Sequence, residues 1–176
     1  MVYSSVKKMF GSMLFGNFSS LVALQIFGYI FPIITVPYLF RTLGVEVYGL
    51  VMFATSLMAY FNIFVDFGFN LSAVRSVSVN RESHKMVVEI FNSVLWGKVL
   101  LVFVAFCVLF CCVEFLPIFK AHAALYYFSF ASVIGNALFP VWFFQGIEKM
   151  RYITIISLLA KVISILPIFL LIKLPE

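Results

Sequence analysis

Three charged side chains lie inside long apolar stretches of this sequence, where a charge needs a specific partner or surrounding. These residues are Asp66, Lys98 and Lys161. An ionised side chain in hydrocarbon costs on the order of a few kcal/mol, so such residues face the interior of a helix bundle or an aqueous cavity. They are therefore the first candidates for residues that bind a substrate.

Asp66 and Lys98 are spaced so that their side chains can meet. Asp66 precedes Arg75 by nine residues, and Lys98 follows Glu89 by nine. If Arg75 and Glu89 mark the same membrane surface, the helical rise puts both charges roughly 13 Å inside it. We hypothesise an ion pair or a water-linked pair; alternatively, Lys98 extends its stem to the interface. Asp66 itself fits either a purely structural pair or a role in proton coupling.

Lys161 lies deeper than a lysine stem can span. It follows Arg151 by ten residues, which places it roughly 15 Å from that surface. Its ammonium either bonds to backbone carbonyls in a packed bundle or lines a central cavity that receives an anion. Uncharged polar residues in the apolar stretches either line the same cavity or join helices by hydrogen bonds. These residues are Asn17, Gln25, Asn62 and Asn136.

Residues for catalysis or metal binding are not grouped along the sequence. Cys107, Cys111 and Cys112 share one apolar stretch, but no histidine or carboxylate stands at ligand spacing from them. His84 and His122 are expected on opposite sides of the membrane, so they cannot act together. A membrane enzyme of glycolipid metabolism would need clustered carboxylates or histidines. We therefore expect no enzyme, no catalytic residue, no metal site and no cofactor.

The composition excludes a soluble domain. Hydrophobic residues make up 64% of the chain, and the mean hydropathy is +1.14, too apolar for the available polar side chains to cover. The net charge of +5 does not indicate a nucleic-acid partner, because the basic residues are scattered between apolar stretches rather than gathered on one face. The sequence predicts an all-α integral membrane protein.

Long uncharged stretches define the expected membrane helices. A helix needs roughly 20 apolar residues to cross the hydrocarbon core. We expect a single transmembrane region over residues 1–176, with five spans and short connections between them. The spans cover about 12–39, 48–73, 90–113, 123–145 and 152–172.

Basic residues that flank the spans predict the orientation of the chain. Positively charged residues accumulate on the cytoplasmic side of membrane proteins. Seven basic residues fall on one side and three on the other, so we expect a cytoplasmic N-terminus. The seven are Lys7, Lys8, Arg75, Arg81, Lys85, Lys149 and Arg151, and the three are Arg41, Lys120 and Lys173.

Several spans contain helix-breaking residues. Proline removes a backbone donor and clashes with the preceding turn, so we expect a kink near Pro32. Such breaks occur in transporters, where neighbouring helices or a water-filled cavity satisfy the freed carbonyls, but static bundles contain them too. The interrupting residues are Gly28, Pro32, Pro37, Gly68, Gly135 and Pro140.

Three ordered strings support a transporter. They are Pro37-Tyr38-Leu39 with Arg41-Thr42-Leu43-Gly44 and Tyr48-Gly49, then Asp66-Phe67-Gly68-Phe69-Asn70 with Arg75, then Trp142-Phe143-Phe144-Gln145-Gly146. Together they resemble the N-terminal part of the Wzx-type polysaccharide-unit flippases, within the multidrug/oligosaccharidyl-lipid/polysaccharide exporter superfamily. The motif positions carried over are Arg41, Gly44, Gly49, Gly68, Arg75, Gln145 and Gly146.

The resemblance implies flipping of undecaprenyl-diphosphate-linked oligosaccharide units across the bacterial inner membrane, for O-antigen lipopolysaccharide or capsular polysaccharide. Members of that family have about twelve helices in two six-helix lobes around a cationic cavity, so the five spans would form part of the first lobe of a truncated transporter. Expected partners are the lipid-linked oligosaccharide, membrane lipids and polysaccharide polymerase or export proteins. Gly44 and Gly49 would serve backbone geometry rather than substrate contact.

Two other functions remain open at this point. A multidrug antiporter of the same superfamily would favour carboxylates for cationic drugs, whereas the spans carry one carboxylate and two lysines. That balance favours an anionic substrate, for which Lys161 offers charge complementarity where dielectric screening is weak. The other alternative is a membrane fragment that inserts without transporting anything.

Overall fold

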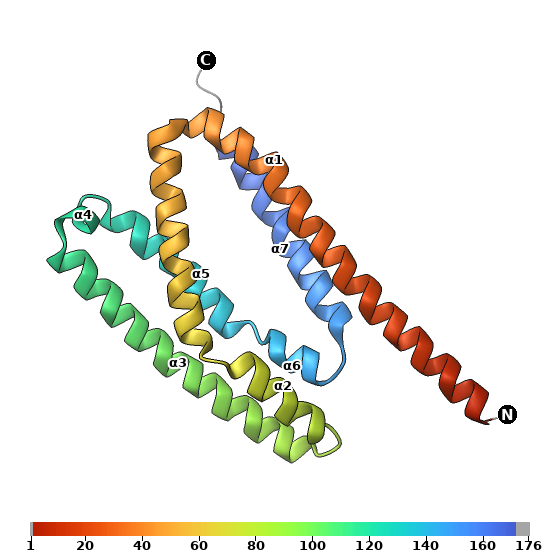
Figure 1. Cartoon of the computed structure of the whole chain (residues 1–176). Coiled ribbons are helices and arrows are strands. Elements are labelled where there is room, and N and C mark those ends of the chain that lie inside the picture. The colour runs from red at the N-terminus through yellow and green to blue at the C-terminus, as the bar shows by residue number, and fades with distance from the viewer. Residues whose placement is uncertain (1, 172–176) are drawn as a thin grey trace. The chain divides into compact units, whose positions relative to one another are not determined.

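The computed structural model describes residues 2–171, and all regular structure within that range is helical (Figure 1). Among the residues that the structure describes, three helical segments are long and apolar enough to cross a membrane: Gly28–Val79, His84–Phe115 and Ala123–Gly146. These findings confirm an all-α membrane protein. The helices are α1 (Val2–Asp66), α2 (Phe69–Val79), α3 (His84–Phe115), α4 (Pro117–Lys120), α5 (Ala123–Leu138), α6 (Val141–Gly146) and α7 (Met150–Leu171).

Helix α1 is two helices that meet at Gly44. Gly44 has a φ of 78° and a ψ of 166°, a conformation that favours glycine because it lacks a Cβ. The backbone keeps helical dihedral angles through Pro32 and Pro37, and the kink expected near Pro32 stays a prediction. With α1 counted as two and α5 taken together with α6, the long helical segments number about five, as predicted.

Two expected spans are each divided by a short break. The span predicted over 48–73 ends at Asp66, because Phe67 and Gly68 have φ values of 38° and 79°, and α2 then continues to Val79. The span predicted over 123–145 is interrupted at Phe139, which is extended with a ψ of 107°. The following Pro140 disfavours a helical conformation at the residue before it. Both interruptions fall where glycine or proline predicted them.

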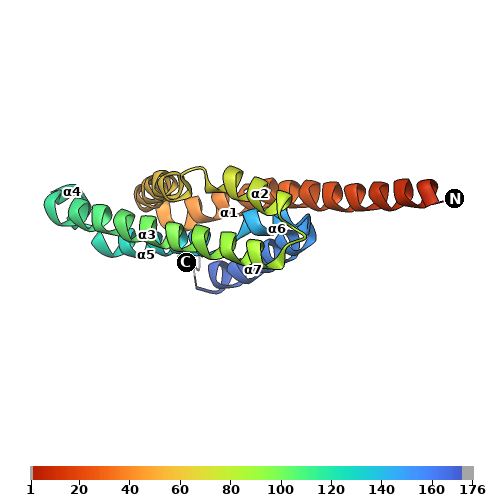
Figure 2. The ribbon, with the colours of Figure 1, turned by 90° about the horizontal axis from the view of Figure 1, so that it is seen from below.

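The chain forms two compact units. One combines Met1–Val45 with Glu148–Glu176, and the other is Glu46–Ile147. In the second unit α3 and α5 lie side by side (Figure 2). Its main core joins the second part of α1 to both helices through residues that include Ala54, Ala105 and Phe130. Fully buried alanines allow helices to approach closely, as in other membrane bundles.

A second core lies between α2, α3 and α6. Ala73, Val77 and Trp142 are buried there. A Cβ added to Gly146 would stand 2.7 Å from Val77 Cβ, so the absence of a side chain at Gly146 lets α6 pack directly on α2. Elsewhere large apolar side chains are exposed, for example Leu71 at 83%, which fits a surface covered by lipid.

Candidate functional site

Lys98 and Asp66 form an ion pair between α3 and the end of α1. Lys98 Nζ donates a hydrogen bond to Asp66 Oδ1 at 2.9 Å, and the lysine side chain is 5% exposed while that of Asp66 is 34% exposed. The hypothesised pair is therefore confirmed. The alternative, in which Lys98 extends to the interface, is wrong. The ammonium is buried beside a carboxylate that balances its charge, so the side chain does not need to reach water.

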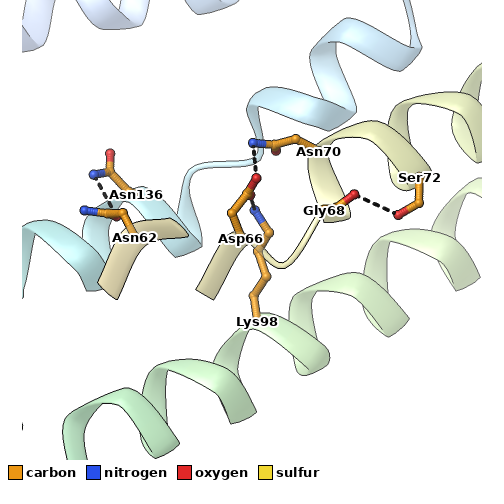
Figure 3. Close-up of polar contacts among 7 residues, drawn as sticks. All are labelled: Asn62, Asp66, Gly68, Asn70, Ser72, Lys98 and Asn136. Atoms are coloured by element: carbon orange, nitrogen blue, oxygen red, sulfur yellow. Dashed lines mark hydrogen bonds and ion pairs between the residues drawn. The ribbon is translucent and has the colours of Figure 1, made fainter. Parts of the chain in front are cut away.

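The carboxylate of Asp66 also holds the helix break together (Figure 3). Asn70 Nδ2 donates to Asp66 Oδ2 at 2.8 Å across the Phe67–Gly68 break. On the far side of the break, Ser72 Oγ donates to the carbonyl of Gly68 at 3.2 Å. One carboxylate thus links the end of α1 to the start of α2 and to the middle of α3.

A second polar contact joins α1 to α5. Asn136 Nδ2 donates to Asn62 Oδ1 at 3.2 Å, and Asn62 Nδ2 donates to the carbonyl of Met58 at 2.9 Å. The prediction that these asparagines join helices by hydrogen bonds is confirmed. They also line a cavity beside the ion pair, whereas their place in one cavity with Lys161 stays a prediction.

The cavity lies within the unit Glu46–Ile147 and has a volume of about 430 Å³. Its polar lining consists of Asn62, Asp66, Asn70, Lys98 and Asn136. Asn70 was not among the predicted polar residues, although it stands four positions after Asp66 in one of the quoted strings. A spacing of four residues is the one at which side chains on a helix are neighbours, so it could have indicated this contact.

Lys161 lies in the other unit, on α7. It is half-buried, and its Nζ lies 3.7 Å from the position that a Cβ on Gly28 would occupy. The glycine therefore leaves space for the ammonium beside α1. Gln25 is exposed and donates to the hydroxyl of Tyr29 at 2.9 Å, and the side chain of Asn17 lies outside the described residues. Their place in one cavity with Asp66 stays a prediction.

The two glycines of the first motif string behave differently. Gly44 needs its positive φ, which confirms the expected backbone role. Gly49 lies within a regular helix, and a Cβ there would meet nothing within 4 Å. The expectation that Gly49 also serves a special backbone geometry is therefore wrong. Arg41, from the same string, is exposed.

The second and third motif strings converge in space. Arg75 of α2 and Gln145 of α6 line a common pocket of about 390 Å³, and Gly146 packs against Val77. The sequence did not predict this proximity, because it arises from the packing of α6 on α2 after the break at Pro140. Gly68 supports the arrangement by redirecting the chain at the start of α2.

Comparison with known proteins places the chain in a family. The family described as "Polysaccharide biosynthesis protein" matches residues 14–176. The chain is 34% identical over 152 residues to the "Putative O-antigen transporter" of Escherichia coli (strain K12), covering 86% of this chain and 36% of that protein. It is 32% identical over 150 residues to the protein of the same name from Shigella dysenteriae, covering 84% and 37%.

The chain spans a little over a third of the length of these relatives. No solved structure matches it. The family match confirms the resemblance that the three motif strings indicated. The chain belongs to the polysaccharide biosynthesis protein family.

Proposed function

We propose that this chain takes part in flipping lipid-linked oligosaccharide units across the bacterial inner membrane, for O-antigen or capsular polysaccharide. The observation that carries the proposal is the similarity, over 86% of the chain, to a relative whose name is that of an O-antigen transporter. Such names indicate a transporter rather than an enzyme. The substrate proposed is an oligosaccharide on undecaprenyl diphosphate, with its lipid part in the surrounding bilayer.

The geometry supports transport through its broken helices. The breaks at Phe67–Gly68 and Phe139–Pro140 both border the cavity beside the Asp66–Lys98 pair. Non-helical backbone at membrane depth is tolerated where it lines a cavity or is buried in protein, and transporters place their substrate sites at such interruptions. Static bundles contain helix breaks too, so the support comes from two breaks that border one polar cavity.

Electrostatics favour an anionic lipid-linked substrate over a cationic drug. Asp66 is the one carboxylate within the expected spans, and its charge is already balanced by Lys98. A cationic drug would have to displace that ammonium. Lys161 is the residue that we assign to the diphosphate.

The basic residues that flank the expected spans support a cytoplasmic N-terminus.

Deletion in the source organism tests the proposal. Removing the reading frame that carries this chain is expected to abolish surface polysaccharide and to accumulate undecaprenyl-linked units on the cytoplasmic side. Mass spectrometry of extracted lipids measures the accumulated units. Their accessibility to an external glycosidase shows on which side of the membrane they lie. Restoring the frame from a plasmid is the control. Normal polysaccharide without accumulation, in a strain with no second flippase, would contradict the proposal.

A further inference from the structure

We propose that the cavity beside the Asp66–Lys98 pair binds uncharged sugar hydroxyl groups of the transported oligosaccharide rather than its diphosphate. This inference rests on the proposed function, which it refines by assigning one part of the substrate to one cavity. It follows from the charge, the hydrogen-bonding groups and the size of the cavity.

The ionic groups of the cavity cancel. Lys98 is the lysine in the lining and Asp66 is the carboxylate, and their charged atoms are 2.9 Å apart. A diphosphate entering the cavity would be attracted by one and repelled by the other at nearly the same distance. Because opposite charges this close leave little net field, the cavity offers no preference for an anion.

The remaining hydrogen-bonding capacity suits hydroxyl groups. Lys98 makes one hydrogen bond to a described residue, to Asp66, and an ammonium has further N–H donors. Asn136 uses one N–H to reach Asn62, and Asn70 uses one to reach Asp66, which leaves their amide oxygens as acceptors. The cavity therefore presents donors and acceptors together, and a sugar hydroxyl both donates and accepts.

The size and the other walls fit a small part of a glycan. A volume of about 430 Å³ lies within the range of small-molecule sites, which are mostly apolar with a few placed polar groups. Ile63, Phe139 and Val141 also line the cavity and supply apolar surface. The C–H faces of a sugar ring can lie against such walls while its hydroxyls reach the amides.

The same groups would select between sugars. A site that hydrogen-bonds a substrate hydroxyl binds an analogue that lacks it less tightly, because that hydrogen bond is then lost. Asn62 and Asn136 are held by each other and by the carbonyl of Met58. We infer that they recognise the position of a hydroxyl group on one sugar of the repeat unit.

A binding experiment separates the sugar from the diphosphate. The full reading frame that carries this chain is purified in detergent and titrated calorimetrically with two probes. One is the oligosaccharide released from the strain's own lipid intermediate by mild acid, and the other is inorganic pyrophosphate. We expect Asn136→Ala to weaken glycan binding by about tenfold and to leave pyrophosphate binding unchanged. Asn92→Ala, an exposed asparagine of α3 outside the cavity, is the control.

A second variant guards against loss of folding. Asn136→Ser keeps a hydroxyl, so its glycan affinity should lie between those of the wild type and Asn136→Ala, with similar unfolding temperatures. An unchanged glycan affinity in Asn136→Ala, or displacement of the glycan by pyrophosphate in the wild type, would overturn the inference. If deletion accumulates lipid-linked units but the released glycan does not bind, the inference fails and the proposed function stands. If the glycan binds but deletion has no effect, the proposed function fails.

Discussion

Two lysines in apolar helices have different surroundings. Lys98, in the unit Glu46–Ile147, is 4% exposed and its charge is balanced by Asp66 at 2.9 Å. Lys161, in the other unit, is half-buried beside Gly28. The two apolar stretches of that unit, 9–40 and 152–172, contain no acidic residue.

The difference shows that burial of a lysine does not define its role. A lysine held by a carboxylate joins helices and leaves the neighbouring cavity without net charge. Lys161 is the lysine that we assign to the diphosphate, because a positive charge where dielectric screening is weak attracts an anion. We therefore expect the first to contribute mainly to stability and the second mainly to transport.

The largest effect is expected from breaking the ion pair. Asp66→Ala leaves the ammonium of Lys98 buried without its carboxylate, and should lower the free energy of unfolding by about 3 kcal/mol, because an uncompensated buried charge is costly. Denaturation by sodium dodecyl sulfate in mixed micelles measures this change. Glu114→Ala is the matched control, since its pair with Lys120 at 3.4 Å is solvent-exposed and such pairs contribute less than about 1 kcal/mol.

Exchanging the charges tests whether the pair itself is responsible. Asp66→Lys combined with Lys98→Asp restores the attraction in reverse, and should be more stable than either single variant. Equal instability of all three would show that the contact contributes nothing. The uncharged combination of Asp66→Asn with Lys98→Met removes both ions. It should recover much of the stability, because no buried charge is then left without a partner.

The second effect concerns Lys161 and transport. Lys161→Ala should lower polysaccharide export by about tenfold, a barrier change of roughly 1.4 kcal/mol, while membrane insertion and folding stay intact. Lys161→Arg keeps the charge and should retain most export, and Lys120→Ala changes an exposed lysine as the control. Surface polysaccharide per unit of inserted protein is the measurement. Full export by a well-expressed Lys161→Ala protein would remove the assignment of this residue to the substrate.

The ion pair could be predicted because it depends on a fixed geometry. Helical rise converts equal numbers of residues from one surface into equal depth, and that arithmetic placed Asp66 opposite Lys98. The contact of Asn70 with Asp66 was missed although its spacing of four residues is that of helical neighbours, and the positive φ of Gly68 between them does not prevent it.

The breaks themselves were only partly predictable. Pro32 remains inside a helix, since the loss of one backbone hydrogen bond can be offset by the surroundings of a membrane helix. Gly44, where α1 breaks with a positive φ, lies in the connection expected between the spans 12–39 and 48–73, whereas the helical Gly49 lies inside the second of these spans. Arg75 and Gln145 line one pocket because the chain breaks at Gly68 and again at Pro140. Local sequence patterns do not predict how the segments that follow two breaks pack together.

A smaller effect is expected at Gly68, the glycine between Asp66 and Asn70. Gly68→Ala places a Cβ on a residue with a φ of 79°, which should lower the free energy of unfolding by about 1 kcal/mol. Gly49→Ala is the control, since Gly49 is helical and a Cβ would meet open space. It should be neutral or slightly stabilising, because alanine is the better helix former. Equal stability of the two variants would show that the left-handed break is not required near the pair.

The smallest effect is expected beside Lys161. A Cβ on Gly28 would lie 3.7 Å from Lys161 Nζ, an ordinary van der Waals distance, so Gly28→Ala should leave export unchanged. Gly28→Val adds methyl groups that crowd and desolvate the ammonium, so export should fall severalfold. Gly135→Val is the matched control on α5, where a Cβ meets nothing within 4 Å. If Gly28→Val exports normally, the space beside the ammonium is not used by the substrate, and the contrast between the two lysines would rest on Lys161→Ala alone.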